Sequence, residues 1–166
     1  VAQSTRNHRK GFDLLADALT TLDAENITLL SIGSNEPDLQ TSFAHQHLGS
    51  LNSDMLLSVF YGLADLFVIP SRQDNLPNTV LESMACGTPV VGFNIGGIPD
   101  MVRPGTTGWL AAPESVRSLR DAIDNALANE ANRKQMGRRC REVVEAEYAL
   151  AVQARAYEQL YRSLLA

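Results

Sequence analysis

Residues 66–97 constrain the fold of this chain more than any other stretch. Two short apolar runs, at 66–69 and 89–93, flank a polar loop and a helical pattern at 78–85. Apolar runs of this length are typical of strands buried on both faces, and a helix is the usual connection between two parallel strands. The stretch therefore predicts a strand–helix–strand unit.

The alternation of strand and helix patterns continues through most of the chain. Apolar runs predict further strands at 27–32, 45–48 and 108–110. Apolar residues at helical spacing predict helices at 11–23 and from Ser53 onward. This order is typical of an α/β fold, in which a Rossmann-like parallel sheet is sandwiched between helices.

The last third of the chain contains helical patterns only. Apolar residues recur at helical spacing at 116–127, at 136–144 and from Tyr148 to the end. We therefore expect a helical C-terminus. We also expect Trp109 and the aromatic residues of the last segment to lie in the core, namely Tyr148, Tyr157 and Tyr161.

Composition places the chain among soluble globular proteins. Of its 166 residues, 45% are hydrophobic and 20% are charged, and the net charge is −5. No excess of basic residues favours a nucleic acid as partner, and no apolar run approaches the ~20 residues that a membrane helix needs. Cys86 and Cys140 lack the spacing of a metal site and are expected to be free thiols of a cytosolic protein.

The polar loop at 71–78 leads into a helix whose first amides can bind an anion. Asn75 or Asn78 is expected to cap this helix. The amides of Asn78, Thr79 and Val80 would then point out of the helix start, with the positive end of the helix dipole behind them. An ordinary capped helix with water at its end is the alternative interpretation.

Two carboxylates, Asp74 and Glu82, lie eight residues apart around the start of this helix. An ionised carboxylate accepts hydrogen bonds from hydroxyl groups through two oxygens. The loop follows a predicted strand, and open parallel sheets bind ligands at the carboxyl ends of their strands. The stretch thus suits a ligand that contains both a phosphate and a sugar.

Several segments together resemble a known family of enzymes. Residues 74–82 resemble the E-x7-E motif of retaining GT-B glycosyltransferases of family 4. Other signatures of that family resemble, in order, Lys10-Gly11 and residues 64–71, 84–91, 96–100 and 105–108. The resemblance covers nearly the whole chain and implies the C-terminal half of such an enzyme, which binds the nucleotide sugar.

The resemblance implies a role for three charged residues. Glu82 would hold the ribose hydroxyls of the nucleotide. Asp74 would bind hydroxyls of the donor sugar, although the family has the longer glutamate at this position. Lys10 would bind the diphosphate and neutralise its charge as the glycosidic bond breaks. Asp74 and Lys10 are therefore the expected catalytic residues.

The chain departs from the family pattern at two places. The family arginine that binds the diphosphate is missing, because Gln3 and Ser4 stand there, and Arg6 or Arg9 could serve instead. In the E-x7-E motif, Asn75 stands where the family has glycine. Asparagine is the best substitute where φ is positive, so the turn can form. The further donor-binding residues implied by the motif are Asn75, Leu76, Asn78, Thr79 and Val80.

The chain begins at Val1 without a methionine, and residues 1–3 are typical of the end of a strand. We therefore expect residues 1–166 to form one nucleotide-sugar-binding domain, a fragment that lacks the N-terminal acceptor domain. The expected partners are a nucleotide sugar and, through the missing half, a glycan or lipid acceptor. We expect a cytoplasmic protein of polysaccharide biosynthesis, with any membrane association supplied by the missing half.

The expected function is donor binding within a retaining transferase that moves a hexosyl group, and the isolated chain should be inactive. The family needs no metal or other cofactor. A non-catalytic nucleotide-binding module stays open, although the first loop lacks the G-x-G-x-x-G of a dinucleotide site. A response-regulator domain would need acids where Gln3 and Ser4 stand. A GT-B phosphorylase or epimerase is the remaining enzyme alternative.

Overall fold

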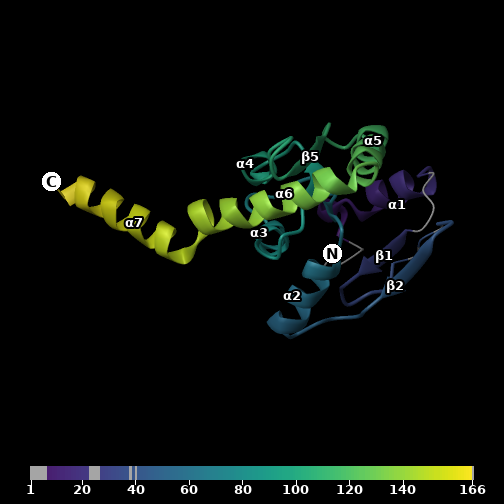
Figure 1. The fold of residues 1–166 in the computed structure, drawn as a ribbon, viewed down its shortest axis with the longest axis horizontal. Coiled ribbons are helices and arrows are strands. Elements are labelled where there is room, and N and C mark those ends of the chain that lie inside the picture. Colours follow the sequence, from purple (N-terminus) through teal and green to yellow (C-terminus); the bar gives the residue numbers. More distant parts are fainter. Residues whose placement is uncertain (1–6, 23–26, 38, 40, 166) are drawn as a thin grey trace.

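The computed structural model describes residues 7–22, 27–37, 39 and 41–165 (Figure 1). The strands are β1 (Thr28–Ser31), β2 (Ala44–His47), β3 (Phe67–Ile69), β4 (Val90–Phe93) and β5 (Gly108–Ala111). The helical elements are the 3-10 turn η1 (His8–Lys10), α1 (Phe12–Thr20), α2 (Asp54–Leu63), α3 (Asn78–Ala85), α4 (Ile98–Met101), α5 (Val116–Leu127), α6 (Glu130–Val143), the π-helical turn η2 (Val144–Tyr148) and α7 (Leu150–Leu165). The predicted α/β class and the helical C-terminus are confirmed.

The strands of the described residues form two parallel sheets instead of the one that the sequence predicts. β1 pairs with β2, and β3, β4 and β5 form the second sheet in that order. Every pairing is parallel, with helices between successive strands of the second sheet. In the described residues β1 and β3 share no hydrogen bond, and residues of both strands line one cavity.

The core consists of two apolar clusters on opposite faces of the β3–β4–β5 sheet. Val91 and Phe93 of β4 point into one cluster, which α1 and α5 cover. Val90 points into the other, which contains residues of α3, α4 and α6. Successive side chains of a strand face opposite sides, and all four residues of β4 are buried. This burial explains why the sequence at 89–93 is a continuous apolar run rather than an alternating one.

The C-terminal helix α7 projects from the body of the molecule (Figure 1) and has no buried residue. Tyr157 and Tyr161 are each 61% exposed, and their rings stack on each other at 6.4 Å. The prediction that these two tyrosines lie in the core is therefore wrong. Helical periodicity identifies an apolar face, but it does not say what covers that face.

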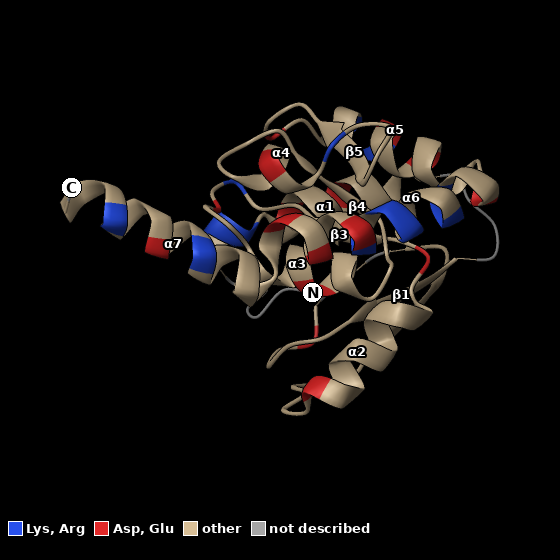
Figure 2. Cartoon of the chain, turned by 60° about the vertical axis from the view of Figure 1, so that its left-hand side comes forward, with Lys and Arg blue, Asp and Glu red and all other residues tan. Residues whose placement is uncertain are grey.

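The other two aromatic residues predicted in the core are partly buried. Trp109 packs against the cluster between α1 and α5. Tyr148 packs against the opposite cluster, and its hydroxyl donates to the carbonyl of Asp100 at 3.1 Å. The ribbon colours in Figure 2 mark charged residues of both signs along α6 and α7. Among the described residues, none of the helices combines the length and the hydropathy of a transmembrane span.

Candidate functional site

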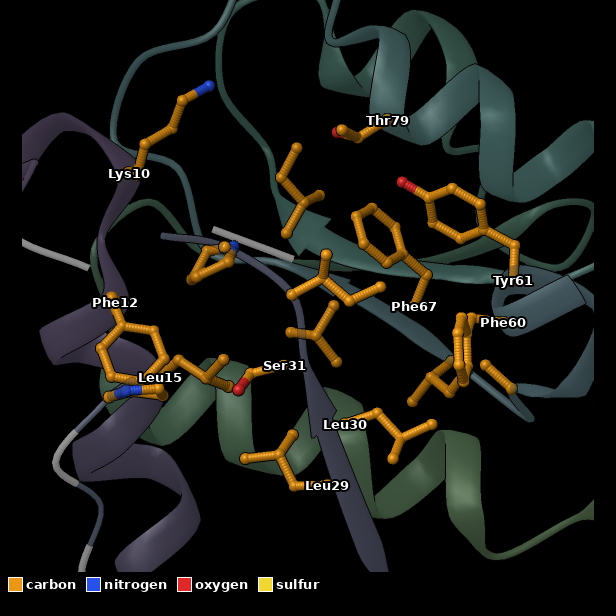
Figure 3. A pocket seen from close by; sticks show the side chains of 18 of the residues that line it. Lys10, Phe12, Leu15, Leu29, Leu30, Ser31, Phe60, Tyr61, Phe67 and Thr79 are labelled. Carbon is orange, nitrogen blue, oxygen red and sulfur yellow. The ribbon is translucent and has the colours of Figure 1, made fainter. Parts of the chain in front are cut away.

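A cavity of about 940 Å³ lies between the two sheets and is also lined by α1, α2 and the start of α3. Its apolar walls come from residues of β1, β3 and α1, such as Leu29 and Phe67. Polar residues line it where the chain leaves the carboxyl ends of strands. Figure 3 shows Lys10 on the α1 side of this cavity, with Thr79 and Tyr61 on the opposite side.

Lys10 and Asp74 meet at this cavity although 64 residues separate them in the sequence. The Lys10 ammonium Nζ lies 2.8 Å from Asp74 Oδ2. The hydroxyl of Ser71 donates to the same oxygen at 3.2 Å. The Lys10 side chain is 29% exposed and that of Asp74 is 15% exposed, so solvent screens this pair less than a surface pair. The two expected catalytic residues therefore form an ion pair.

Backbone contacts fix the turn that carries Lys10. The Asn7 side chain caps η1 by accepting from the Arg9 amide at 3.1 Å. Gly11 ends the turn with φ 64°, a left-handed conformation that favours glycine. A Cβ at this position would lie 1.8 Å from the carbonyl oxygen of Pro70, so only glycine lets η1 approach the end of β3 this closely. This close approach explains sterically why glycine follows Lys10 in the sequence.

Two glycines hold the loop that carries Asp74. A Cβ on Gly96 would lie 1.9 Å from the Asp74 carbonyl oxygen, and one on Gly97 would lie 1.6 Å from that of Asn75. The Gly97 amide also donates to the Asp74 carbonyl at 3.2 Å. This close backbone contact sets the position of the Asp74 loop relative to β4.

The expectation of a positive φ at Asn75 is wrong. Among the described residues other than glycine, only Glu114 has a positive φ, of 57°. The turn at Asn75 is thus one that any residue can adopt, and the contact with Gly97 shapes it instead. Asn75 and Leu76 are both exposed, and Leu76 lines the cavity.

The start of α3 differs from the expectation in two respects. The helix follows Pro77, and no side chain caps it, so neither Asn75 nor Asn78 has the predicted capping role. The Val80 amide donates to the Pro77 carbonyl at 2.9 Å, and the Val80 side chain is fully buried in the core. Val80 is therefore no candidate for contact with a ligand, because the tight first turn uses its amide. Asn78 and Thr79 do line the cavity.

Glu82 lies one turn further along α3, is exposed and lines the cavity. Its Oε2 accepts a hydrogen bond of 3.2 Å from the hydroxyl of Tyr61 on α2. Tyr61 is 5% exposed, and its ring packs edge-on against Phe67 at 5.6 Å. Burial and the neighbouring Glu82 charge hold the pKa of Tyr61 well above its usual value, so this hydroxyl stays a donor.

Sequence reasoning missed Tyr61, although a signal was present. The residue lies on a predicted helix just before a predicted strand, where an apolar side chain would suffice to fill the core. A buried tyrosine usually finds a partner for its hydroxyl. A carboxylate on the next helix, Glu82, is such a partner.

The two arginines expected to bind the diphosphate have different outcomes. Arg9 is exposed and does not line the cavity. Arg6 lies outside the described residues, as do residues 1–3, which were expected to end a strand. Its role stays a prediction.

Two histidines of β2 contact the same hydroxyl group of β1. His45 Nε2 and His47 Nδ1 each lie 2.9 Å from the Ser31 hydroxyl of β1. Within the described residues, no group of three or more His, Cys, Asp or Glu side chains could hold a metal ion. These contacts link the side chains of β2 to β1 across the paired strands.

Comparison with known proteins places these motifs in a family. The profile of the family described as glycosyl transferases group 1 matches residues 1–129. The sulfoquinovosyl transferase SQD2 of Arabidopsis thaliana is 32% identical over 142 residues, which are 82% of this chain and 28% of that protein. The D-inositol 3-phosphate glycosyltransferase of Mycobacterium tuberculosis is 41% identical over 71 residues, which are 43% of this chain and 15% of that protein.

Solved structures share the fold. The sucrose-phosphate synthase of Thermosynechococcus elongatus superposes with a TM-score of 0.82 at 28% identity, over 96% of this chain and 43% of that chain. The Anabaena protein HepE, solved with UDP and glucose, gives 0.78 at 18% identity, over 96% of this chain and 47% of that one. This chain thus spans less than half of each of these relatives. Since the family profile covers residues 1–129 of 166, the chain belongs to the glycosyl transferases group 1 family.

Proposed function

We propose that this chain binds the nucleotide-diphospho-sugar donor of a retaining glycosyltransferase that transfers a hexosyl group. One observation carries the proposal: Lys10, Asp74 and Glu82 line one cavity, and the two carboxylates have the spacing of the E-x7-E motif. HepE, which shares the fold, was solved with UDP and glucose. A cavity with an ammonium group and two hydroxyl acceptors suits a ligand of that chemistry.

Each charged residue has a distinct task in this proposal. In the reaction, the bond between the anomeric carbon and the diphosphate oxygen breaks, and its electron pair stays on the diphosphate. The acceptor hydroxyl oxygen forms the new bond to the anomeric carbon, and the hydroxyl proton passes to the departing diphosphate. The Lys10 ammonium leaves Asp74 for the diphosphate and neutralises the charge that develops there. Asp74, released from Lys10, accepts from hydroxyls of the sugar. Glu82, oriented by Tyr61, accepts from the ribose hydroxyls.

The proposal assigns the acceptor to another part of the enzyme. The chain spans 28% of SQD2 and 43% of the sucrose-phosphate synthase chain. We propose that a glycan or lipid acceptor binds to a second domain, and that this chain alone binds the donor nucleotide but transfers little sugar. None of the described residues is needed to hold a metal in this scheme.

Calorimetry with UDP, GDP and ADP tests donor binding, on this chain and on Glu82→Ala. Binding of one nucleotide that the substitution weakens about tenfold or more would support the proposal, because the carboxylate accepts charge-assisted hydrogen bonds. Glu142→Ala, at an exposed position of α6, is the matched control and should bind as the unsubstituted chain does. Absence of binding to all three nucleotides in a folded sample would contradict the proposal.

A second assay separates a transferase half from a non-catalytic binding module. A longer protein that contains this chain and an acceptor domain should release nucleoside diphosphate from a nucleotide sugar only when the acceptor is present. Loss of this release in Asp74→Ala, with nucleotide binding intact, would support the proposed role of Asp74. Binding without turnover in that longer protein, across a panel of acceptors, would favour the binding module.

A further inference from the structure

We infer that Arg72 is a positioning residue that holds the Lys10 turn in place for the donor diphosphate. The inference rests on the proposed function, because it deepens the account of the same site. Arg72 lies in the loop after β3, two residues before Asp74, and is 8% exposed. No motif in the sequence singled it out.

The guanidinium of Arg72 joins three segments that are distant in the sequence. Its Nη1 and Nη2 donate to the two carboxylate oxygens of Asp13 at 2.7 Å and 2.6 Å. Nη1 also donates to the carbonyl of His8 at 2.8 Å. Nε donates to Glu114 Oε2 at 3.1 Å. These partners occupy the planar fork, so Arg72 itself is not available to bind a ligand.

Arg72 fixes two consecutive carbonyls of the Lys10 turn. Its side chain binds the His8 carbonyl, and its backbone amide donates to the Arg9 carbonyl at 2.9 Å. Lys10 is the next residue, and Asp74 lies two residues beyond Arg72 on the same loop. Arg72, through its side chain and its backbone amide, therefore sets the spacing between the backbone that carries Lys10 and the backbone that carries Asp74.

Both carboxylate partners of Arg72 have an unusual property at this contact, Asp13 in its pKa and Glu114 in its backbone conformation. The Arg72 guanidinium holds the pKa of Asp13 below its usual value, so Asp13 stays ionised. Glu114 is the one described residue besides glycine with a positive φ, at 57°. That conformation is unfavourable for glutamate and persists only where the surroundings impose it. In this conformation Glu114 forms the ion pair with Arg72.

Lysine cannot replace Arg72 in this network. A guanidinium donates in a fixed plane to several acceptors at once, whereas an ammonium is a compact point charge. Arg72→Lys keeps the charge but cannot bind Asp13 with two parallel bonds while it also reaches His8 and Glu114. We therefore expect Arg72→Lys to loosen the Lys10 turn. Arg120→Lys, on α5 outside the cavity, is the matched control.

The first arm of the test needs no ligand. Hydrogen exchange is followed at the amides of Lys10 and Gly11, which donate to the carbonyls of Asn7 and His8. In Arg72→Lys we expect these amides to exchange at least about tenfold faster, with α5 unchanged, because a locally loosened turn opens without global unfolding. Unchanged exchange in the folded variant would overturn the inference.

The second arm compares nucleoside diphosphates with their monophosphates, using uridine, guanosine and adenosine. Arg72→Lys should weaken binding of the diphosphate about tenfold, because a misplaced Lys10 ammonium loses its contact with the second phosphate. Binding of the monophosphate should stay nearly unchanged. In a variant that already carries Lys10→Ala, adding Arg72→Lys should not weaken diphosphate binding further, because Arg72 acts through Lys10. An equal loss with and without Lys10 would show a merely structural role and overturn the inference.

The two arms separate this inference from the proposed function. If the unsubstituted chain binds no nucleoside diphosphate, the proposed function fails, and hydrogen exchange still decides whether Arg72 fixes the Lys10 turn. If Arg72→Lys does not fold, the same measurements on Asp13→Asn test whether the Arg72 network holds the Lys10 turn in place. That variant leaves Arg72 bound to His8 and Glu114, so it should show the same changes at smaller amplitude, and no change would count against the inference.

Discussion

The two carboxylates at the cavity are held in different ways. Asp74 accepts from the Lys10 ammonium and the Ser71 hydroxyl, whereas Glu82 accepts from the buried hydroxyl of Tyr61. A charged partner competes with a ligand for the carboxylate, whereas a neutral donor on one oxygen leaves the other oxygen available. At the residue scale, a substitution of Tyr61 can therefore test the role of Glu82 in binding while the Glu82 carboxylate is kept.

Tyr61→Phe should weaken nucleotide binding while the fold is kept. The ring contact with Phe67 stays, and the bond to Glu82 is lost. We expect about three- to tenfold weaker binding of the nucleoside diphosphate, in line with the loss of one hydrogen bond. Calorimetry with the ribose and 2′-deoxyribose forms of the nucleotide measures this effect.

The deoxy form makes the test specific. If Tyr61 orients Glu82 toward the ribose, the preference for ribose over 2′-deoxyribose should shrink in Tyr61→Phe. Tyr157→Phe, at an exposed position of α7, should change neither affinity. An unchanged preference in a folded Tyr61→Phe variant would argue against the orienting role.

The two thiols should differ in reactivity. Cys140 is fully buried, its Sγ donates to the Thr107 carbonyl at 3.2 Å, and burial raises its pKa to about 12. Cys86 is partly exposed, and burial raises its pKa less far. Since only the thiolate reacts, iodoacetamide should alkylate Cys86 first as the pH rises from 7 to 9. Mass spectrometry of timed samples would show this order, and early labelling of Cys140 would refute it.

At the scale of elements, the sequence predicted well what depends on neighbouring residues. The strands at 66–69 and 89–93 and the helix at 78–85 correspond to β3, β4 and α3. Their apolar runs and helical spacing are local signals. The start of α3 was less predictable, because the tight turn after Pro77 and the burial of Val80 depend on how the helix packs.

Two glycine substitutions test how an element positions the site. Gly97→Ala should destabilise the fold by about 2 kcal/mol or more, since its Cβ would lie 1.6 Å from the Asn75 carbonyl oxygen. It should also displace the Asp74 loop and weaken nucleotide binding. Gly62→Ala, in open space on α2, should stabilise by about 0.5–1 kcal/mol. Urea unfolding measures both effects, and equal midpoints for the two variants would contradict this account.

At the scale of the whole molecule, the sequence predicted the fold class and part of the site. The resemblance to the family implied that Lys10 and Asp74 are both site residues, and the structure brings the two side chains together at one cavity. The contacts of Arg72 could not be predicted in this way, and the contact of Tyr61 was indicated only by the tendency of a buried tyrosine to find a partner for its hydroxyl. They join segments far apart in the chain, and only the packing of helices on the sheets brings them together.

The projection of α7 has a consequence for stability. A chain that ends at Ala149 should keep its core, because α7 has no buried residue. We expect its unfolding midpoint to change by less than about 4 °C. Calorimetric scans of the two chains would test this expectation. A larger fall, or loss of a cooperative transition, would mean that α7 contributes to the fold through η2.

The ion pair between Lys10 and Asp74 changes what a bound anion can gain from this lysine. An arriving diphosphate meets an ammonium group that already has a partner, so the number of ion pairs at the lysine is the same before and after binding. The contribution of Lys10 to affinity is then the free energy of its ion pair with the diphosphate minus that of its ion pair with Asp74, which is smaller than the first of these two values. Discrimination among ligands at this site therefore comes from how well each one also satisfies the carboxylate that it leaves unpaired.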